Sequence, residues 1–299
     1  MLVVERIPCP IMRYHGGKFR LADWIMEFFP DDHDTYVEPF GGAASVLMRK
    51  PRSHAEVYND LDDEVVNVFR VLRDQEQARR LKDLCALTPY ARSEFKLAYE
   101  YTEDPVERAR RTIFRAAAGF GSAGATKDRT GFRSYSKPAR SVTPAIDWAS
   151  YPKVITEFCE RLRGVIIESG AAVDVINRHD AAGTLFFVDP PYMPETRNMA
   201  GNRTYRHEMV EHDHLALLDR LTRVEGFVVL SGYSTETYDQ VLATAGWRRF
   251  SRAASISGNR GTVMRTECVW INPRCKDGMQ QQRLDLRNHA EPAIRSIPC

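Results

Sequence analysis

Four consecutive residues at the end of an apolar run, Asp189-Pro190-Pro191-Tyr192, combine residue types that suit chemistry. The run over 185–189 predicts a buried strand, and the prolines end it because each lacks an N–H and fixes its own φ. Asp189 and the Pro190 carbonyl can then both accept hydrogen bonds at the strand end, and the Tyr192 ring offers a stacking face. Two acceptors beside an aromatic ring suit a planar heterocycle with an exocyclic amine, such as a nucleobase.

A second group of candidate residues surrounds a glycine-rich turn far upstream. Residues 35–39 predict a short strand, and Phe40-Gly41-Gly42 leads from it toward a predicted helix. Nucleotide-like cofactors bind where such a turn follows a strand of a parallel sheet. The next predicted strand, 55–58, is followed by Asp60, and an acid at this place commonly binds a ribose diol. Asp62 is expected to cap the helix that follows. The glycine pattern matches neither a dinucleotide-binding fingerprint nor a phosphate-binding loop, so it favours neither NAD nor ATP.

The order of predicted elements indicates an α/β fold with a mainly parallel, Rossmann-like sheet. An antiparallel hairpin, 247–256 and 263–271, is expected to close that sheet. Residues 1–74 and 151–274 are assigned to the sheet domain, and residues 75–150 to a mostly helical insertion, in which 121–150 show no core periodicity. The polar residues 275–299 are expected to form a flexible tail.

The basic residues are concentrated locally, because the 299-residue chain has a net charge of only +2. Between 108 and 140 there are nine lysines and arginines and one acid, Asp128, which favours contact with phosphates. Thr130-Gly131 is predicted to be a hairpin turn. The four candidate DNA-binding residues around it are Arg129, Arg133, Lys137 and Arg140. Arg129 and Arg133 flank the turn and can reach guanine in a groove, whereas Lys137 and Arg140 are assigned to phosphates.

Several classes of protein are excluded by composition. The six cysteines have no paired spacing, which argues against a zinc ribbon and a disulfide framework. His207, His212 and His214 lie close together without a partner cysteine, so a polar loop is favoured there and no metal is expected. The chain shows no signal peptide and no apolar stretch of about 20 residues that could span a membrane. The expected location is therefore cytoplasmic.

The Phe40-Gly41-Gly42 turn, Asp60 and the Asp189-Pro190-Pro191-Tyr192 motif, in this order, resemble the Dam-like family of S-adenosylmethionine-dependent DNA adenine-N6 methyltransferases. The resemblance covers roughly residues 8 to 272. It includes Tyr14-His15-Gly16-Gly17-Lys18 and, at the last predicted strand, the segment 266–272. In this family an inserted target-recognition domain separates the cofactor loop from the Asp-Pro-Pro-Tyr motif, which implies that role for residues 75–150.

The resemblance implies a role for each matching residue. S-adenosylmethionine would contact six residues, Tyr14, Lys18, Phe40, Gly42, Asp60 and Asp189. Asp189, Pro190 and Tyr192 would bind the target adenine and serve catalysis. The chain departs from the family pattern at Ala44, where a second glycine is usual, and at 119–125, which replace a segment associated with GATC readers. The first departure predicts modest loosening of the cofactor loop, and the second weakens any transfer of GATC specificity.

The implied reaction is a direct transfer of a methyl group from the cofactor to the N6 atom of a flipped-out adenine in double-stranded DNA. Arg197, Arg203 and Arg206, which follow the motif, would hold phosphates, close over the site or belong to a solvated loop. Methylation of cytosine N4, RNA adenine or protein glutamine, and an inactive DNA-binding homologue, are the alternatives. A monomer or weak dimer is expected. The recognition sequence and any accompanying restriction nuclease are not encoded in these motifs.

Overall fold

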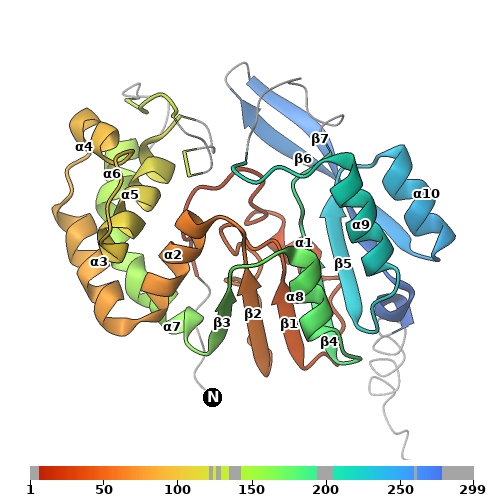
Figure 1. Ribbon diagram of the computed structural model, residues 1–299. Coiled ribbons are helices and arrows are strands. Elements are labelled where there is room, and N and C mark those ends of the chain that lie inside the picture. The colour runs from red at the N-terminus through yellow and green to blue at the C-terminus, as the bar shows by residue number, and fades with distance from the viewer. Residues whose placement is uncertain are drawn as a thin grey trace, which may run out of the picture.

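The computed structural model describes residues 7–120, 124–125, 129–134, 143–193, 205–258 and 261–277. Its strands are β1 (Thr35–Glu38), β2 (Ala55–Asn59), β3 (Val165–Glu168), β4 (Thr184–Val188), β5 (Phe227–Gly232), β6 (Arg248–Gly258) and β7 (Gly261–Ile271). They form one sheet in the order β3-β2-β1-β4-β5-β7-β6 (Figure 1). The first five strands are parallel, and β7 runs antiparallel to both β5 and β6. The predicted Rossmann-like sheet and its closing hairpin are therefore confirmed.

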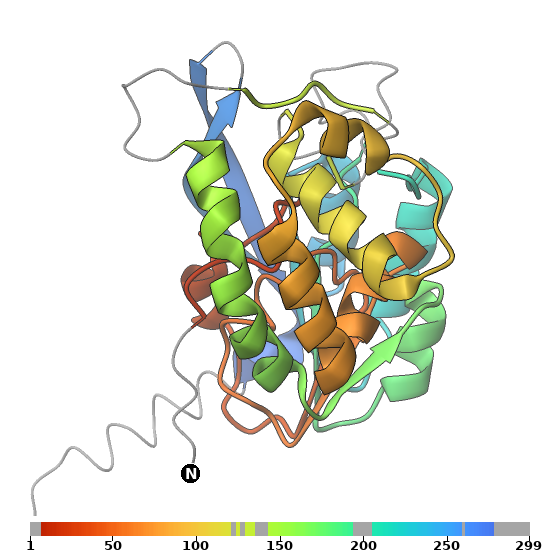
Figure 2. The ribbon, with the colours of Figure 1, turned by 90° about the vertical axis from the view of Figure 1, so that its left-hand side faces the viewer.

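Helices cover both faces of this sheet. They are α1 (Ala22–Met26), α2 (Asp63–Arg73), α3 (Gln75–Leu87), α4 (Arg92–Leu97), α5 (Pro105–Ala118), α6 (Pro144–Ser150), the 3₁₀ turn η1 (Tyr151–Val154), α7 (Ile155–Leu162), α8 (Ala172–His179), α9 (Glu211–Leu221) and α10 (Glu236–Thr244). Helices α3 to α7 gather beside α2 at one side of the sheet, the side that faces the viewer in Figure 2. Within the described residues, none of the helices has the length and apolar content needed to cross a bilayer.

Alternating side chains of the strands enter two apolar clusters. On β1, Tyr36 belongs to the cluster shared with α1, α2, α5 and α7, whereas Val37 belongs to the cluster shared with α8, α9 and α10. On β4, Phe187 and Phe186 divide in the same way. All five residues of β4 are buried, as a parallel strand covered on both faces requires. This burial explains why the strand before Asp189 reads as an unbroken apolar run.

The helical part packs directly on the sheet domain. Helix α5 is capped by Asp104, whose carboxylate accepts from the Val106 amide, and its Phe114 is fully buried in the cluster that contains Phe69 of α2. Helices α6 and α7 were not anticipated from the sequence. Their apolar residues Trp148 and Phe158 join the same cluster. Turn-forming residues around these two helices obscure their helical periodicity in the sequence.

Two local expectations are wrong. The helix expected after Phe40-Gly41-Gly42 is a series of turns, because the Leu47 amide donates to the buried Glu38 carboxylate instead of a helical carbonyl. Cys275, assigned to the flexible tail, is fully buried, and its amide donates to the Asn272 side chain. The described chain therefore continues beyond the expected end of the core.

Candidate cofactor and catalytic site

A cavity of about 330 Å³ opens at the carboxyl ends of β1, β2 and β4. Its lining includes all six residues expected to contact the cofactor, Tyr14, Lys18, Phe40, Gly42, Asp60 and Asp189. They come from four separate segments of the chain, which the parallel strands bring to one edge. The volume falls within the range of small-molecule sites. The structure thus brings together residues that are up to 175 positions apart in the sequence.

The glycine-rich loop is held in place by polar groups of β2 and the turn after it. The Gly42 amide donates to Asp60 Oδ2 at 2.8 Å, and the Tyr58 hydroxyl donates to the Gly42 carbonyl at 2.7 Å. Gly42 has a φ of +49°, and a Cβ atom there would lie 2.7 Å from the Tyr14 ring. Glycine is required at this position by both its conformation and its close contact.

Asp60 both fixes the glycine-rich loop and lines the cavity. Its second oxygen, Oδ1, accepts from the Asp62 amide at 2.8 Å, so the carboxylate fixes the loop while it also lines the cavity. Burial raises the pKa of Asp60 to about 6, although the two amide hydrogen bonds oppose that shift. The expected capping role of Asp62 is confirmed, because its side chain accepts from the Glu64 amide at the start of α2.

Ala44 adopts the left-handed backbone conformation, with a φ of +50°, and is fully buried. This is the position at which a glycine is usual in the family that the sequence resembles. An L-residue in this conformation is strained by about 1–2 kcal/mol because its Cβ crowds the carbonyl oxygen. The departure noticed in the sequence therefore has a conformational cost.

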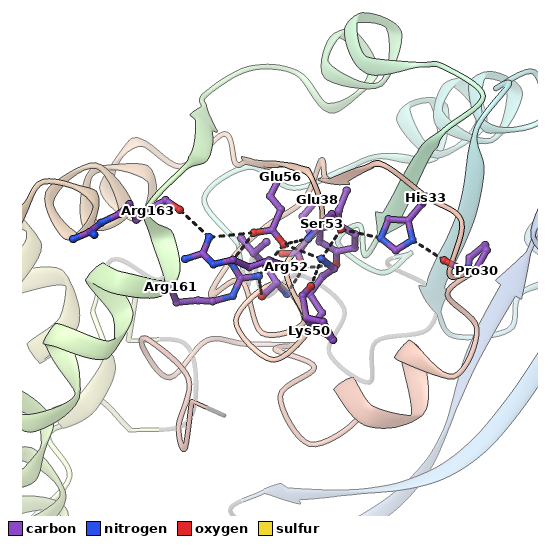
Figure 3. A network of polar contacts seen from close by, with 12 residues as sticks. Pro30, His33, Glu38, Lys50, Arg52, Ser53, Glu56, Arg161 and Arg163 are labelled. Carbon is purple, nitrogen blue, oxygen red and sulfur yellow. Dashed lines mark hydrogen bonds and ion pairs between the residues drawn. The ribbon is translucent and has the colours of Figure 1, made fainter. Parts of the chain in front are cut away.

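A buried polar network supports the loop from beneath (Figure 3). Glu38 accepts from the Tyr36 hydroxyl and the Leu47 amide, both at 2.7 Å, and burial raises its pKa to about 7. Next to it, Glu56 accepts from Lys50 at 2.8 Å and from Arg161 of α7 at 2.6 Å. Arg161 also donates to the Leu47 carbonyl. The conformation of the loop is thus fixed from both β1 and α7.

Asp189 leaves β4 next to a buried cation. Lys18 Nζ donates to Asp189 Oδ2 at 3.0 Å and to the Gly16 carbonyl at 2.7 Å. It is also 3.0 Å from Oδ1, yet that oxygen is buried and receives no well-oriented hydrogen bond from any described residue. Burial raises the pKa of Asp189 to about 6, and the charge of Lys18 opposes the shift. One carboxylate oxygen is therefore anchored, and the other retains capacity to accept.

Tyr192 is held by contacts that the sequence did not reveal. Its hydroxyl donates to Glu267 Oε2 of β7 at 2.9 Å, and its ring meets Tyr233 edge-on with centroids 4.4 Å apart. Lys18 Nζ lies 4.8 Å from the centre of the same ring. Glu267 is only 6% exposed. An acid inside the apolar segment of the last strand was the available signal, since a buried carboxylate needs a partner.

The residues after the motif cover part of the cavity. Tyr205 donates to the His15 carbonyl at 3.2 Å, and Arg206 pairs with Asp62 at 3.1 Å. Both residues line the cavity. Of the three roles considered for Arg206, this contact favours closing over the site, whereas Arg197 and Arg203 lie outside the described residues. His207 also lines the cavity, and the described residues contain no group of three His, Cys, Asp or Glu placed to hold a metal.

The candidate DNA-binding residues have different surroundings. Arg129 is exposed, and Arg133 donates to the Ala117 carbonyl at the end of α5 at 2.9 Å. Thr130-Gly131 is not the predicted hairpin turn, because Phe132 bridges to Gly119 and the segment runs alongside the end of α5. Lys137 and Arg140 lie outside the described residues.

The arginines of α5 do not form an unpaired basic surface. Arg110 and Arg111 pair with Glu107, and Arg115 pairs with Glu64. Arg108 lies 4.0 Å from Glu64 as well. The apparent excess of charge arose because these acids precede the counted window. Phosphate contact is therefore not supported for this helix.

The chain is similar to several known proteins. Residues 14–252 match the family described as D12 class N6 adenine-specific DNA methyltransferase. The DNA adenine methylase of Serratia marcescens is 25% identical over 240 residues, which cover 75% of this chain and 83% of that protein. The type II methyltransferase M1.LlaDCHI of Lactococcus lactis subsp. cremoris is 24% identical over 250 residues, or 78% and 84% of the two chains. A SAM-dependent methyltransferase structure from Agrobacterium tumefaciens gives a TM-score of 0.40 at 10% identity, over 87% of this chain and 64% of that one.

Proposed function

Because the chain belongs to the D12 class N6 adenine-specific DNA methyltransferases, which use S-adenosylmethionine, we propose that its cavity binds this cofactor and that Asp189 and Tyr192 receive a flipped adenine of double-stranded DNA. The family assignment decides for adenine N6 among the acceptors that the sequence left open. The roles of individual residues rest on the geometry described above.

The lining of the cavity fits the cofactor's chemistry. Asp60 at the end of β2 suits the ribose hydroxyls, since each carboxylate oxygen can accept more than the one amide that it already holds. Phe40 and the glycine backbone provide an apolar wall and close approach. Lys18 stands at the junction between this cavity and Asp189. The cofactor, when bound, supplies an electrophilic methyl group on a sulfonium.

The adenine site is built around the unsatisfied oxygen of Asp189. Oδ1 and the Pro190 carbonyl accept the two N6 protons, which favours a pyramidal nitrogen whose lone pair is available for attack. The Tyr192 ring stacks on the base and offsets part of the few kcal/mol that flipping costs. Glu267 and Tyr233 keep that ring in one orientation before the base arrives.

In the reaction the adenine N6 atom forms a bond to the methyl carbon as the carbon–sulfur bond breaks. The residues of the chain contribute orientation and charge, and no covalent enzyme intermediate is required. The nitrogen then loses one proton, for which Asp189 Oδ1 is the nearest acceptor. Lys18 keeps Asp189 ionised in spite of its burial, because its charge lowers the pKa of the carboxyl.

We assign DNA target recognition to the insertion, residues 75–150, with Arg129 as the described residue best placed to reach DNA because it is exposed. A monomer or weak dimer remains our prediction for the oligomeric state.

The observation that carries this proposal is the buried Asp189 carboxylate, ion-paired with Lys18 and with capacity at Oδ1 to accept a further hydrogen bond, beside Tyr192 and the cavity. The test is methylation of random-sequence duplex DNA with labelled cofactor, followed by mapping of the modified atom. Asp189→Ala should abolish transfer while calorimetry still detects cofactor binding. Methyl groups on an atom other than adenine N6, or full turnover by Asp189→Ala, would contradict it.

A further inference from the structure

The segment that leads into α9 contributes five consecutive residues to the lining of the cofactor cavity, Tyr205, Arg206, His207, Glu208 and Met209. We call residues 205–209 the strap. It belongs to no helix or strand, and it passes over the carboxyl ends of the parallel strands before α9 begins (Figure 1). Without the hydrogen bonds of a helix or a sheet, its position over the cavity depends on individual contacts with the rest of the chain.

The first contact joins the strap to the turn before α1. The Tyr205 hydroxyl donates to the His15 carbonyl at 3.2 Å, and the centroid of the Tyr205 ring lies 6.2 Å from that of Tyr14 and 5.7 Å from that of His15. Gly16 has a φ of +73°, and a Cβ atom there would lie 2.7 Å from the Tyr205 hydroxyl oxygen. The first glycine of the Tyr14-His15-Gly16-Gly17-Lys18 motif therefore both permits the turn and leaves room for the strap.

The second contact joins the strap to the residue that caps α2. Arg206 Nη1 donates to Asp62 Oδ1 at 3.1 Å, and the side chains of Arg206 and Asp62 are 39% and 5% exposed. The second oxygen of Asp62, Oδ2, is buried and accepts no hydrogen bond from the described residues. Burial raises the pKa of Asp62, and the charge of Arg206 opposes this shift most strongly. The ionised form of Asp62 therefore depends on Arg206, which binds the strap to the start of α2.

A second cation lies near Arg206. Burial lowers the pKa of Arg115 of α5, and the charge of Arg206 adds to that shift, so the two guanidinium groups are close enough to repel each other. Arg115 is held by its pair with Glu64 at 3.2 Å. Arg206 is more exposed and belongs to a segment without regular structure. Removal of the charge of Asp62 should therefore release Arg206 toward the solvent.

We propose that Tyr205 and Arg206 are positioning residues that retain the cofactor, because their two contacts hold the strap over the occupied cavity. The proposal rests on the proposed function, which takes this cavity as the cofactor site. Exchange of S-adenosylmethionine then requires the strap to open, and opening breaks the contacts with His15 and Asp62. The demethylated product leaves the same cavity, so the strap also slows product release.

The test measures how fast the cofactor dissociates. Protein loaded with tritium-labelled S-adenosylmethionine is mixed with excess unlabelled cofactor, and the label that stays bound is counted on filters over time. Arg206→Ala should raise the dissociation rate about tenfold, because a hydrogen bond to a charged group contributes roughly that factor. Tyr205→Phe should also raise this rate, but by less, since the hydrogen bond that it removes joins neutral groups. Arg206→Lys should keep most of the retention, because its ammonium can still pair with Asp62.

Two further variants distinguish the ion pair from a general loss of charge. Arg223→Ala removes a 71% exposed arginine that pairs with Asp219 at the far end of α9, so it should leave the dissociation rate unchanged. Asp62→Asn keeps a residue that caps a helix equally well but removes the charge that Arg206 uses. It should raise the dissociation rate as Arg206→Ala does, and the double variant should be no faster than either single variant. Additive effects of Asp62→Asn and Arg206→Ala would overturn the ion pair as the cause of retention.

Urea denaturation shows whether each variant is folded, and if Arg206→Ala is not, Arg206→Gln takes its place. If the unaltered protein binds the cofactor but Arg206→Ala and Tyr205→Phe release it within about twofold of the Arg223→Ala rate, the strap does not retain the cofactor and the proposed function stands. If the unaltered protein does not bind S-adenosylmethionine, the proposed function itself fails, and retention by the strap fails with it.

Discussion

The contact between Tyr192 and Glu267 offers a test of how the stacking ring is positioned. Glu267→Ala removes the acceptor that the partly buried Tyr192 hydroxyl uses, and Tyr192→Phe removes one of the donors to the 6% exposed Glu267 carboxylate, which Tyr233 also contacts. Each loss should lower the free energy of unfolding by about 1.5–3 kcal/mol, the range for a hydrogen bond to a charged group. Glu267→Gln should cost less, because its amide oxygen can still accept.

A double-mutant cycle isolates the contact. Because the hydrogen bond is lost in either single variant, the double variant should be less destabilised than the sum of the two, by about 1–2 kcal/mol. Urea denaturation followed by tryptophan fluorescence gives the four free energies. Tyr233 belongs to the same cluster, because burial and then the charge of Glu267 raise the pKa of Tyr233 to about 12. Tyr233 is left unchanged in all four proteins of the cycle.

The same variants should separate positioning from simple stability. With 2-aminopurine at the mapped target position of a duplex, Glu267→Ala should reduce the fluorescence rise that reports an extruded base, while cofactor affinity stays unchanged. In a Tyr192→Phe background the further change Glu267→Ala should have little additional effect on that signal. A coupling within about 0.3 kcal/mol of zero, or a normal fluorescence rise in Glu267→Ala, would refute the reasoning.

Three further outcomes are expected. Ala44→Gly should raise the free energy of unfolding in urea by about 0.5–1 kcal/mol because it relieves the left-handed strain, whereas Ala43→Gly next to it should lower that energy; equal effects would contradict the strain. Asp60→Ala should weaken S-adenosylmethionine binding by about 1–3 kcal/mol in calorimetry and also loosen the Gly42 loop, and unchanged affinity would remove Asp60 from the site. The kcat/KM of methylation should fall about tenfold per unit below pH 6, because the pKa of Asp189 is raised to about 6 and the protonated form no longer accepts from the amine. A flat activity profile down to pH 5 would contradict this assignment. The contribution of Asp189 to stability has the opposite sign, because the native state takes up the proton at a higher pH than the unfolded chain. The stability that this group contributes therefore rises as the pH falls from about 6 toward 4.

The sheet could be predicted because its strands are short apolar runs buried on both faces. A continuous apolar run such as 184–188 fits a parallel strand that is covered on both faces of a sheet. Because the strands are parallel, the acid after β2 and the prolines after β4 lie at the same edge. The same reasoning placed Asp60 at that edge, whereas Tyr14 and Lys18 were assigned to the site by the family resemblance. The fold and the outline of the site follow from local patterns and from a fixed strand order.

The features that could not be predicted from the sequence depend on contacts between distant segments. The Leu47 amide bonds to Glu38, which prevents the helix that the residues after Gly42 would otherwise form. Of the acids that neutralise α5, Glu64 lies on a different helix, and Glu107 lies one position before the window counted from Arg108. Glu267 is 75 positions from the tyrosine that it holds. No periodicity reports such pairings, because each is fixed only by tertiary packing.

The apolar cluster that joins α5 and α7 to α2 and β1 bears on how this enzyme could change the DNA sequence that it reads. Since Phe114 and Phe158 share one continuous core with Phe69 and Tyr36, a wholesale exchange of the insertion would open that core and disturb the support of the cofactor loop. The connection between α5 and α6, residues 119–143, lies outside these helices, but its Ala125 belongs to the same cluster and its Phe132 packs against it. Diversification, in evolution or by engineering, is therefore expected to change other residues of this connection while Ala125, Phe132 and the helices are kept.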